Sequence, residues 1–387
     1  MDVIVNATSL LPPVTGIGRY TYNLMSTLQR LADVKTHYIY NNVLSENLEY
    51  GKSTASSKVL LKKLFKSLVP QPYRVSQWLR QRAFNTAVQR YHPALYHEPN
   101  YLPLDFNGPT VVTVHDLSVI RYPESHPKDR VKQFERLLSG AVHRADAIIV
   151  DSDFIRGEVI DYFSVSPDKV FTTLLGVGQE FYPFAPDNIA STLSSHNLGY
   201  KSYLLVVGTL EPRKNLPLIL EAYKALSPEL RELFPLVIAG MRGWNLEQFD
   251  KELQGMVQSG QVRLLGYVRD SDLPKVYAGA KVFLFPSKYE GFGLPPLEAM
   301  ASGLPVLASN RASIPEVVGE AGILLDPDDP IEWTNAINSL LEDDEQEHRL
   351  SNLSLARAHT FTWERCAEQT LAAYEYALGR PIARRRQ

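Results

Sequence analysis

Short apolar runs rich in Val, Ile and Leu alternate along the chain with segments whose apolar residues recur at helical spacing. Gly, Pro or polar residues bound each run, a pattern typical of buried strands in βα units and of a parallel sheet. In the first half, this pattern predicts strands at 3–7, 36–40, 94–97, 110–115, 147–150 and 170–173. In the second half, it predicts strands at 203–207, 236–239, 262–265, 282–285 and 305–309. A polar stretch at 186–200 separates the two series.

The two series predict an α/β protein with two similar parallel-sheet domains that face each other across a cleft. The length of 387 residues agrees, because it is about twice that of a usual domain. We place the first domain at 1–180, the second at 181–366 and a C-terminal segment at 367–387. The apolar spacing at 362–378 predicts an amphipathic helix, which a basic tail follows. Ligands are expected at the carboxyl ends of the strands of both sheets.

The composition is that of an ordinary globular chain, with 44% hydrophobic residues, 21% charged residues and a net charge of −3. It excludes long disorder and a generally nucleic-acid-binding protein. The one cysteine, Cys366, excludes a disulfide scaffold and a cysteine-based metal cluster. The chain starts without the basic segment of a signal peptide, and no apolar run approaches the roughly 20 residues that span a bilayer. We therefore expect a cytoplasmic location.

The charge is unevenly distributed. Residues 1–180 carry 20 Lys and Arg against 17 Asp and Glu, whereas residues 181–387 carry 20 against 26. Between Glu49 and Glu98 there is no acidic residue, and an apolar stripe between lysines at 59–69 predicts a basic amphipathic helix. Such a helix either binds an anionic membrane surface or packs its apolar face on the protein with solvated lysines. The stretch 52–90 is therefore a candidate membrane contact.

The strongest chemical signal is the segment from Tyr289 to Glu298, directly after a predicted strand. Gly291 and Gly293 let backbone N–H groups approach a ligand, and Pro296 suits the first position of a helix, which would put Glu298 in its first turn. N–H groups at a helix start suit a phosphate, whereas Glu290 and Glu298 suit hydroxyl groups. A sugar diphosphate has both. The alternative is that Glu298 only complements the helix dipole.

Arg213 and Lys214 form a second candidate anion site. They follow a buried strand and Gly208, just before a predicted helix. Two adjacent cations at that position oppose the helix dipole unless an anion binds there, which favours a diphosphate contact. The alternative is an exposed charged turn.

These motifs resemble those of the retaining glycosyltransferases of family GT4, which have the GT-B fold. The resemblance rests on the Glu-x7-Glu spacing of Glu290 and Glu298 and on the segments 208–215, 239–240, 265–268 and 299–306. In the first half, 16–20 and 114–116 also match, so the resemblance covers essentially the whole chain. It implies two Rossmann-like domains and a C-terminal helix that returns to the first domain.

The resemblance also implies roles for individual residues. It implies that four residues act at the reaction centre, namely His115, Arg213, Lys214 and Glu290. The donor contacts that it implies are Gly16, Gly18, Arg213, Lys214, Tyr267, Val268, Glu290, Gly291, Phe292, Gly293, Leu294 and Glu298. The acceptor side that it implies comprises Arg19, Tyr20, Asp116, Ser152 and Arg156. His115 would touch a hydroxyl of the donor sugar, and Asp116 either orients His115 or is structural.

The segments at 115–123 and 208–215 most resemble bacterial mannosyltransferases of surface polysaccharide (O-antigen) assembly. The expected donor is GDP-mannose, with GDP-rhamnose or a UDP-hexose as alternatives. The expected acceptor is a glycan or a polyprenyl-diphosphate-linked glycan. No cofactor and no metal are expected, and Asp151-Ser152-Asp153 is interpreted as a turn and helix cap rather than as a metal-binding Asp-x-Asp motif. The alternatives of other classes are an epimerase, a phosphorylase and a non-catalytic sugar-nucleotide-binding protein.

Overall fold

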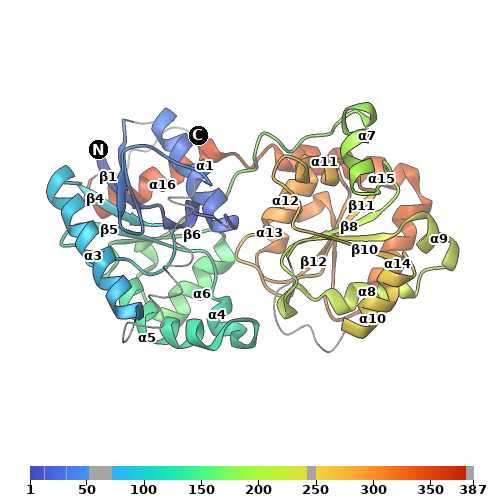
Figure 1. The fold of residues 1–387 in the computed structure, drawn as a ribbon, viewed down its shortest axis with the longest axis horizontal. Helices are drawn as coiled ribbons and strands as arrows, with labels where there is room; N and C mark the ends of the chain where they lie inside the picture. Colours follow the sequence, from blue (N-terminus) through green and yellow to red (C-terminus); the bar gives the residue numbers. More distant parts are fainter. Residues whose placement is uncertain (13, 32, 52–71, 242–249, 381–387) are drawn as a thin grey trace.

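A computed structural model describes residues 1–12, 14–31, 33–51, 72–241 and 250–380. These residues form two lobes joined by chain crossings on one side (Figure 1). In the described part of the first lobe, seven strands form one sheet in the order β3-β2-β1-β4-β5-β6-β7. Their bounds are β1 Asp2–Asn6, β2 Lys35–Tyr40, β3 Val43–Ser45, β4 Leu95–Glu98, β5 Thr110–Val114, β6 Ala147–Val150 and β7 Val170–Thr172. Neighbouring strands are parallel except for β2 and β3.

The described part of the second lobe contains a six-stranded sheet in the order β10-β9-β8-β11-β12-β13. The paired strands are parallel. Their bounds are β8 Leu204–Val207, β9 Leu236–Ala239, β10 Val262–Gly266, β11 Val282–Phe285, β12 Val306–Ser309 and β13 Ile323–Leu325. Both sheets thus confirm the predicted pair of parallel α/β domains.

Helices cover both faces of each sheet (Figure 1). Those that follow the strands of the first sheet are α1 Gly16–Leu31, α3 Pro72–Tyr91, α4 Ser118–Arg121, α5 Lys128–Arg144 and α6 Asp153–Phe163. Those of the second lobe are α7 Pro186–Ser195, α8 Leu216–Lys224, α9 Pro228–Leu233, α10 Asp250–Gln258, α11 Leu273–Ala278, α12 Leu294–Ala301, α13 Ile314–Val318, α14 Pro330–Glu342 and α15 Asp344–Ala358. No described helix is long and apolar enough to cross a bilayer.

The last described helix, α16 (Trp363–Ala377), packs on the first lobe against α1, β5, β6 and β7. Buried Tyr374 fixes it there, because its hydroxyl lies 2.8 Å from His97 Nδ1 at the centre of the first sheet. The expected return of the C-terminal helix to the first domain is therefore confirmed. The boundary that we placed between residues 366 and 367 falls inside this helix.

The structure differs from the predicted elements in two ways. The strands β3 and β13 were missed, because each has three residues and lies at a sheet edge, where little apolar pattern is required. The polar stretch at 186–200 is largely helix α7, since Ile189 and Leu193 give it a buried face. The basic amphipathic helix predicted at 59–69 and most of the basic tail lie outside the described residues.

Candidate active site between the lobes

Each sheet has one point at which the order of its strands reverses. In the first sheet this point lies between β1 and β4, and in the second it lies between β8 and β11. Connections leave the two neighbouring strands toward opposite faces there, which opens a crevice at the carboxyl ends where open α/β sheets bind ligands. Most residues predicted for the site lie on loops at these edges.

Close backbone packing shapes the edge of the second sheet. Gly208 and Gly240 follow β8 and β9, and both have φ of +151°, where a side chain is strained. A Cβ atom on Gly240 would lie 1.9 Å from the Gly208 carbonyl oxygen. Glycine is therefore required where these loops meet, next to the turn that carries the predicted cations.

Arg213 and Lys214 lie in the short 3-10 helix Pro212–Lys214, at the carboxyl edge of β8. The Arg213 Nη1 atom donates hydrogen bonds to the Tyr289 carbonyl at 2.8 Å and to Glu290 Oε2 at 2.9 Å. Lys214 Nζ donates to Glu290 Oε1 at 2.5 Å. The structure thus brings the adjacent Arg213 and Lys214 together with Glu290, which lies 77 and 76 positions later in the sequence. The exposed-turn alternative for the two cations is wrong, because only 14% of the Arg213 side chain and 15% of the Lys214 side chain are exposed.

The charges at this point are matched in the absence of a ligand. Burial would raise the pKa of Glu290, but Arg213 and Lys214 outweigh it and lower that pKa to about 2, so the carboxylate is ionised at neutral pH. Glu211 Oε1 lies 2.6 Å from Arg213 Nε, which is not aligned to donate a hydrogen bond to it. Arg213 Nε therefore forms a close ion pair with Glu211 whose geometry is not that of a hydrogen bond.

The second predicted carboxylate, Glu298, is also buried, but its place in the helix was predicted wrongly. Helix α12 begins at Leu294, because Gly293 at φ +117° forms its N-cap, and Glu298 is therefore in the second turn. Its carboxylate accepts hydrogen bonds from Tyr277 Oη at 2.9 Å and from Arg19 Nη1 of the first lobe at 3.2 Å. Burial outweighs these contacts and raises the pKa of Glu298 to about 7.

The loop between the two carboxylates is held in place by Ser313, whose hydroxyl lies 2.9 Å from the carbonyl oxygens of both Glu290 and Phe292. Its other end meets the first lobe. A Cβ atom on Gly291 would lie 1.9 Å from the His115 carbonyl oxygen, so only glycine allows the lobes to meet here. At the neighbouring edge, after β10, Tyr267 is 63% exposed whereas Val268 is buried.

In the first lobe, the predicted glycines lie inside a helix and not in a loop before it. Gly16 is the first residue of α1, and open space surrounds its Cα. Gly18 allows close packing, because a Cβ atom there would lie 2.5 Å from the Ser9 carbonyl oxygen. Arg19 reaches across the cleft to Asp270 at 2.7 Å as well as to Glu298. Tyr20 is buried against the His115 ring, so the structure does not place it on the acceptor side.

His115 lies just after β5, where both of its ring nitrogens have partners. Nδ1 lies 2.7 Å from Asp151 Oδ2, and Nε2 lies 2.9 Å from the Pro99 carbonyl oxygen. Burial alone lowers the pKa of His115, but these two acceptors outweigh it and raise that pKa above its ordinary value. Both nitrogens thus face acceptors, which favours the protonated form of the ring. Neither nitrogen is free for the sugar hydroxyl that we expected it to touch.

The aspartate that orients His115 is Asp151, not Asp116. Asp116 Oδ1 instead accepts hydrogen bonds from Tyr101 Oη and from the backbone and hydroxyl groups of Ser118 at the start of α4. The sequence pattern could not distinguish them, since Asp116 is adjacent in the chain whereas Asp151 is adjacent in the sheet. Interpreting the Asp151 segment as only a turn and helix cap was therefore incomplete.

The remaining acceptor-side candidates have structural contacts. Ser152 is the N-cap of α6, and its hydroxyl also donates a hydrogen bond to the Gly291 carbonyl across the cleft at 2.7 Å. Arg156 donates to the carbonyl oxygens of Pro167 and Val170, at the amino end of β7. That end is opposite the cleft, so Arg156 does not line an acceptor site.

Sequence reasoning missed several residues that join the lobes. Glu316 accepts hydrogen bonds from the backbone N–H groups of Asp153 at 2.8 Å and Phe154 at 2.6 Å, so a carboxylate of the second lobe caps α6 of the first. The Tyr289 hydroxyl accepts from the Leu117 N–H group at 3.0 Å. Nothing in the local sequence marks such contacts, because each partner lies far away in the chain.

Among the described ranges, no group of three or more His, Cys, Asp and Glu side chains is arranged to hold a metal ion. Asp153, the second acid of the Asp-x-Asp segment, accepts a hydrogen bond from the Thr172 hydroxyl at 2.5 Å.

The comparison with known sequences is consistent with this geometry. Residues 14–178 match the model of Glycosyltransferase Family 4, and residues 194–354 match that of Glycosyl transferases group 1. The chain is 37% identical over 383 residues to the O-antigen chain mannosyltransferase B of Escherichia coli, covering 97% of this chain and 100% of that protein. It is 32% identical over 271 residues to an E. coli serotype-specific mannosyltransferase WbdA, of which it covers 33%.

Solved structures show the same arrangement of two Rossmann-like domains, the GT-B fold. Sucrose-phosphate synthase from Thermosynechococcus elongatus superposes with a TM-score of 0.72 at 21% identity, covering 98% of this chain and 99% of that one. Anabaena HepE, solved in complex with UDP and glucose, superposes with a TM-score of 0.69 at 19% identity, covering 97% and 99%. The chain therefore belongs to glycosyltransferase family 4 and is a glycosyltransferase with the GT-B fold.

Proposed function

We propose that this protein transfers mannose from GDP-mannose, with retention of configuration, to a hydroxyl group of a glycan in surface polysaccharide (O-antigen) synthesis. The observation that carries the choice of sugar is the 37% identity to an O-antigen chain mannosyltransferase over essentially the full length of both chains. The matched pair of cations and Glu290 at the strand reversal of the second sheet carries the choice of a diphosphate sugar as donor.

The donor diphosphate would bind to Arg213 and Lys214. Both cations contact Glu290, so a diphosphate would share them with that carboxylate or displace it. Arg213 Nε, which has no aligned acceptor, offers a further donor in a buried position. The released Glu290 then accepts hydrogen bonds from hydroxyl groups of the sugar, which a carboxylate suits better than it suits a phosphate.

Glu298 would bind the ribose hydroxyl groups, at the same carboxyl edge of the second sheet as Arg213 and Glu290. Its two hydrogen-bonding partners, Tyr277 and Arg19, hold the carboxylate in place on the second turn of α12. The backbone of 291–294 lies between the two carboxylates and presents N–H groups to the donor. The segment after β10, with Tyr267 exposed and Val268 buried, would flank the base.

The first lobe would close the reaction centre. Arg19 and Ser152 already contact the second lobe, and the His115 backbone packs against Gly291. Exclusion of water limits hydrolysis of the donor before an acceptor binds. His115 would act by holding this backbone in place through its contacts to Asp151 and Pro99. The pairing of charges leaves no requirement for a metal in this proposal.

The transfer reaction tests the proposal. Purified protein would be incubated with GDP-mannose, GDP-rhamnose or UDP-glucose and a lipid-diphosphate-linked mannose acceptor, and nucleoside diphosphate and glycan products would be measured together. We expect GDP release and chain extension with GDP-mannose. Donor binding by calorimetry without turnover in any mixture would instead establish a non-catalytic binding protein. Preference for UDP-glucose would overturn the choice of sugar.

We also propose that the first lobe meets an anionic membrane surface on the cytoplasmic side, where a polyprenyl-diphosphate-linked acceptor is available. Helix α3 carries four Arg residues and no Asp or Glu. On it Trp78 is 58% exposed, with the Arg82 guanidinium 5.5 Å from its ring. An exposed tryptophan beside cations is typical of contact with anionic lipid headgroups. The adjacent residues 52–71 of the candidate stretch 52–90 lie outside the described ranges.

Vesicle flotation tests the membrane contact. Wild-type protein is expected to float with vesicles that contain anionic lipid and to remain at the bottom with neutral vesicles. Trp78→Ser is expected to reduce flotation, whereas Tyr200→Ser, which changes an exposed aromatic residue of the second lobe, is not. Equal recovery with both kinds of vesicle would contradict the proposal.

A further inference from the structure

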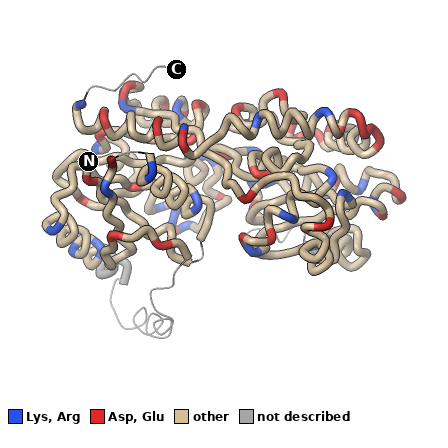
Figure 2. The backbone as a smooth tube through the Cα atoms, turned by 90° about the horizontal axis from the view of Figure 1, so that it is seen from above, with Lys and Arg blue, Asp and Glu red and all other residues tan. Residues whose placement is uncertain are grey.

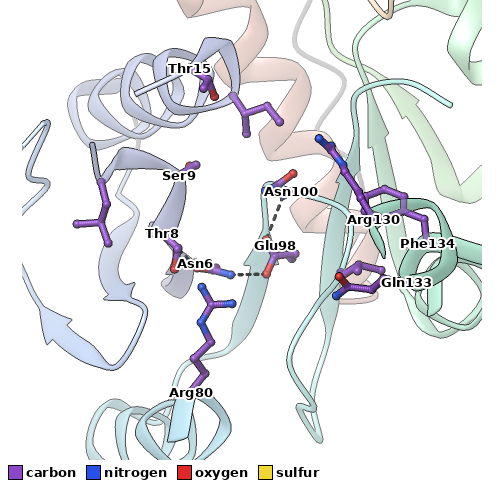
Figure 3. Close-up of a pocket in the computed structure, with 13 residues that line it drawn as sticks. Asn6, Thr8, Ser9, Thr15, Arg80, Glu98, Asn100, Arg130, Gln133 and Phe134 are labelled. Carbon is purple, nitrogen blue, oxygen red and sulfur yellow. Dashed lines mark hydrogen bonds between the residues drawn. The ribbon is translucent and has the colours of Figure 1, made fainter. Parts of the chain in front are cut away.

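The strand reversal of the first sheet holds a cavity that the predicted site residues do not explain. It has a volume of about 500 Å³ and lies at the carboxyl ends of β1 and β4 (Figure 3). Asn6 is the last residue of β1 and Glu98 the last residue of β4, and the two side chains meet at its floor. The volume falls within the range of about 300–1,000 Å³ that is common for small-ligand sites.

The floor of this cavity is a fixed set of polar groups. Glu98 is 1% exposed, and its Oε2 atom accepts hydrogen bonds from Asn6 Nδ2 and Tyr96 Oη, each at 2.7 Å. Its Oε1 atom accepts from the Asn100 N–H group at 3.1 Å. A carboxylate has about four positions at which it accepts hydrogen bonds, so one position on Oε1 remains for a ligand. The floor is thus both rigid and able to accept from a hydroxyl group.

The walls supply hydrogen-bond donors and apolar surface. Arg130 lies on the cavity wall with its guanidinium 5.3 Å from the Phe134 ring. Arg80 lies on the opposite wall, where Asn41 accepts from its Nε atom at 3.1 Å. Leu102 and Phe134 add apolar surface. Donors, acceptors and apolar patches around one cavity match the alternating hydroxyl groups and C–H faces of a sugar ring.

The cavity also adjoins the donor site. Glu98 is followed by Pro99, whose carbonyl oxygen binds His115 at the reaction centre. On the other side, Thr15 and Ile17 line the cavity, and Arg19 on the next turn of α1 contacts Glu298. A ligand in the cavity therefore extends from the first sheet toward the place where the donor sugar is proposed to lie.

We propose that this cavity is a subsite for one neutral hexose unit of the acceptor glycan, with Glu98 and Arg130 as the residues that orient its hydroxyl groups. The inference rests on the proposed transfer of mannose to a glycan. It deepens that proposal by stating where a sugar unit of the acceptor binds. A neutral sugar fits better than the diphosphate of a lipid carrier. Glu98 at the floor already accepts three hydrogen bonds and presents its remaining acceptor position, which suits a hydroxyl group and not an anion, and Arg80 already donates to Asn41.

Binding of a probe in the absence of donor tests the subsite directly. The probe is a methyl α-mannobioside at millimolar concentration, observed by ligand NMR with the full chain, and inorganic diphosphate serves as the competing probe. The variants are Arg130→Gln and Asn100→Ala, and Lys132→Gln on the same helix as Arg130 is the matched control, since Lys132 is exposed and outside the cavity. Glu98→Gln is added together with thermal unfolding, because it disturbs three internal hydrogen bonds.

We expect the wild type and Lys132→Gln to bind the mannobioside equally, and Arg130→Gln to bind it about tenfold more weakly, the size expected for one lost hydrogen bond to a charged group. In the transfer reaction, the same variant is expected to raise KM for the acceptor about tenfold while KM for the donor changes less than twofold. Absence of mannobioside binding to the wild type would overturn the subsite. Binding by Arg130→Gln and Asn100→Ala as tight as that of the wild type would also overturn it.

Displacement of the mannobioside by diphosphate, with diphosphate binding lost in Arg130→Gln, would likewise overturn it in favour of an anion site. The outcome also separates the two proposals. If mannobioside binding depends on the cavity but no donor is turned over, the subsite stands and the proposed transfer of mannose fails. If turnover occurs but KM for the acceptor is the same in the cavity variants as in the wild type, the proposed transfer stands and the subsite fails.

Discussion

At the scale of the residue, the two cations of the second lobe, Arg213 and Lys214, are paired with carboxylates of the protein. Arg213 contacts Glu211 and Glu290, and Lys214 contacts Glu290, so the buried charges are balanced before a donor arrives. Removing one partner from such a cluster leaves a buried charge without compensation, which typically costs about 3–5 kcal/mol. Tests of donor binding must therefore keep the charge at these positions.

Arg213→Lys keeps the charge but loses the planar fork of the guanidinium. We expect kcat/KM for GDP-mannose to fall at least tenfold, because the buried N–H donors at Nε and Nη1 are lost. Arg213→Ala is expected to lower the thermal unfolding midpoint as well. Steady-state kinetics and thermal unfolding measure the two effects, and Arg231→Lys, which lies outside the site, is the control. Unchanged kcat/KM in Arg213→Lys would remove Arg213 from the donor site.

Glu298 predicts a dependence of donor binding on pH. Its folded-state pKa of about 7 lies above the ordinary 4.5, so between these values the folded protein keeps a proton that the unfolded chain has lost. This group's contribution to stability is therefore present below about pH 4.5 and falls as the pH rises to about 7. Only the ionised carboxylate accepts from both ribose hydroxyl groups, so KM for the donor should fall as the pH rises through about 7.

In Glu298→Gln the donor KM is expected to be higher at every pH and no longer to change near pH 7. The measurement is KM for GDP-mannose from pH 6 to 8 in both proteins. A pH profile with the same inflection in the variant would show that another group titrates.

At the scale of the element, the apolar runs were sufficient to predict eleven strands, since a buried parallel strand must be apolar along its length. The start of α12 was not predictable in the same way. Two prolines at 295 and 296 suggest the first turn, but the left-handed φ of Gly293 begins the helix before them. The edge strands β3 and β13 were missed because a strand of three residues is too short to show a pattern of apolar positions.

The loop before α12 requires glycine at position 291 because of backbone packing between the lobes, and not because of contact with a ligand. Gly291→Ala would place a Cβ atom 1.9 Å from the His115 carbonyl oxygen, so the lobes could close only after a shift of backbone. We expect loss of most transfer activity with little change in thermal stability. Gly157→Ala in α6, where the added atom meets nothing within 4 Å, is the matched control and should remain active. Full activity of Gly291→Ala would mean that this contact does not form during turnover.

At the scale of the whole molecule, the lobes are joined by contacts between residues far apart in the sequence. Arg19 and Glu298 are 279 positions apart, and Ser152 and Gly291 are 139 positions apart. Lys, Arg, Asp and Glu occur over both lobes (Figure 2), and the charged contacts across the cleft include the local pairs of Arg19 with Asp270 and Glu298. One sequence could therefore predict which loops face the cleft, but not which side chains meet across it or that His115 pairs with Asp151.

Glu316 tests whether these pairs close the cleft. Glu316→Gln weakens the cap that the second lobe provides to α6, a contact of about 1 kcal/mol. We expect a larger radius of gyration by small-angle X-ray scattering and slower transfer, with the unfolding midpoint nearly unchanged. Glu320→Gln, an exposed neighbour, is the control. An identical radius in Glu316→Gln would show that the remaining contacts suffice.

We propose that the two strand reversals divide the substrates, with the donor in the second lobe and the acceptor in the first. A crystal structure of the protein with GDP-mannose tests it most directly. We expect the diphosphate within hydrogen-bond distance of Arg213 and Lys214, the ribose on Glu298 and the mannose facing Glu290. A nucleotide bound instead in the cavity beside Asn6 and Glu98 would contradict it.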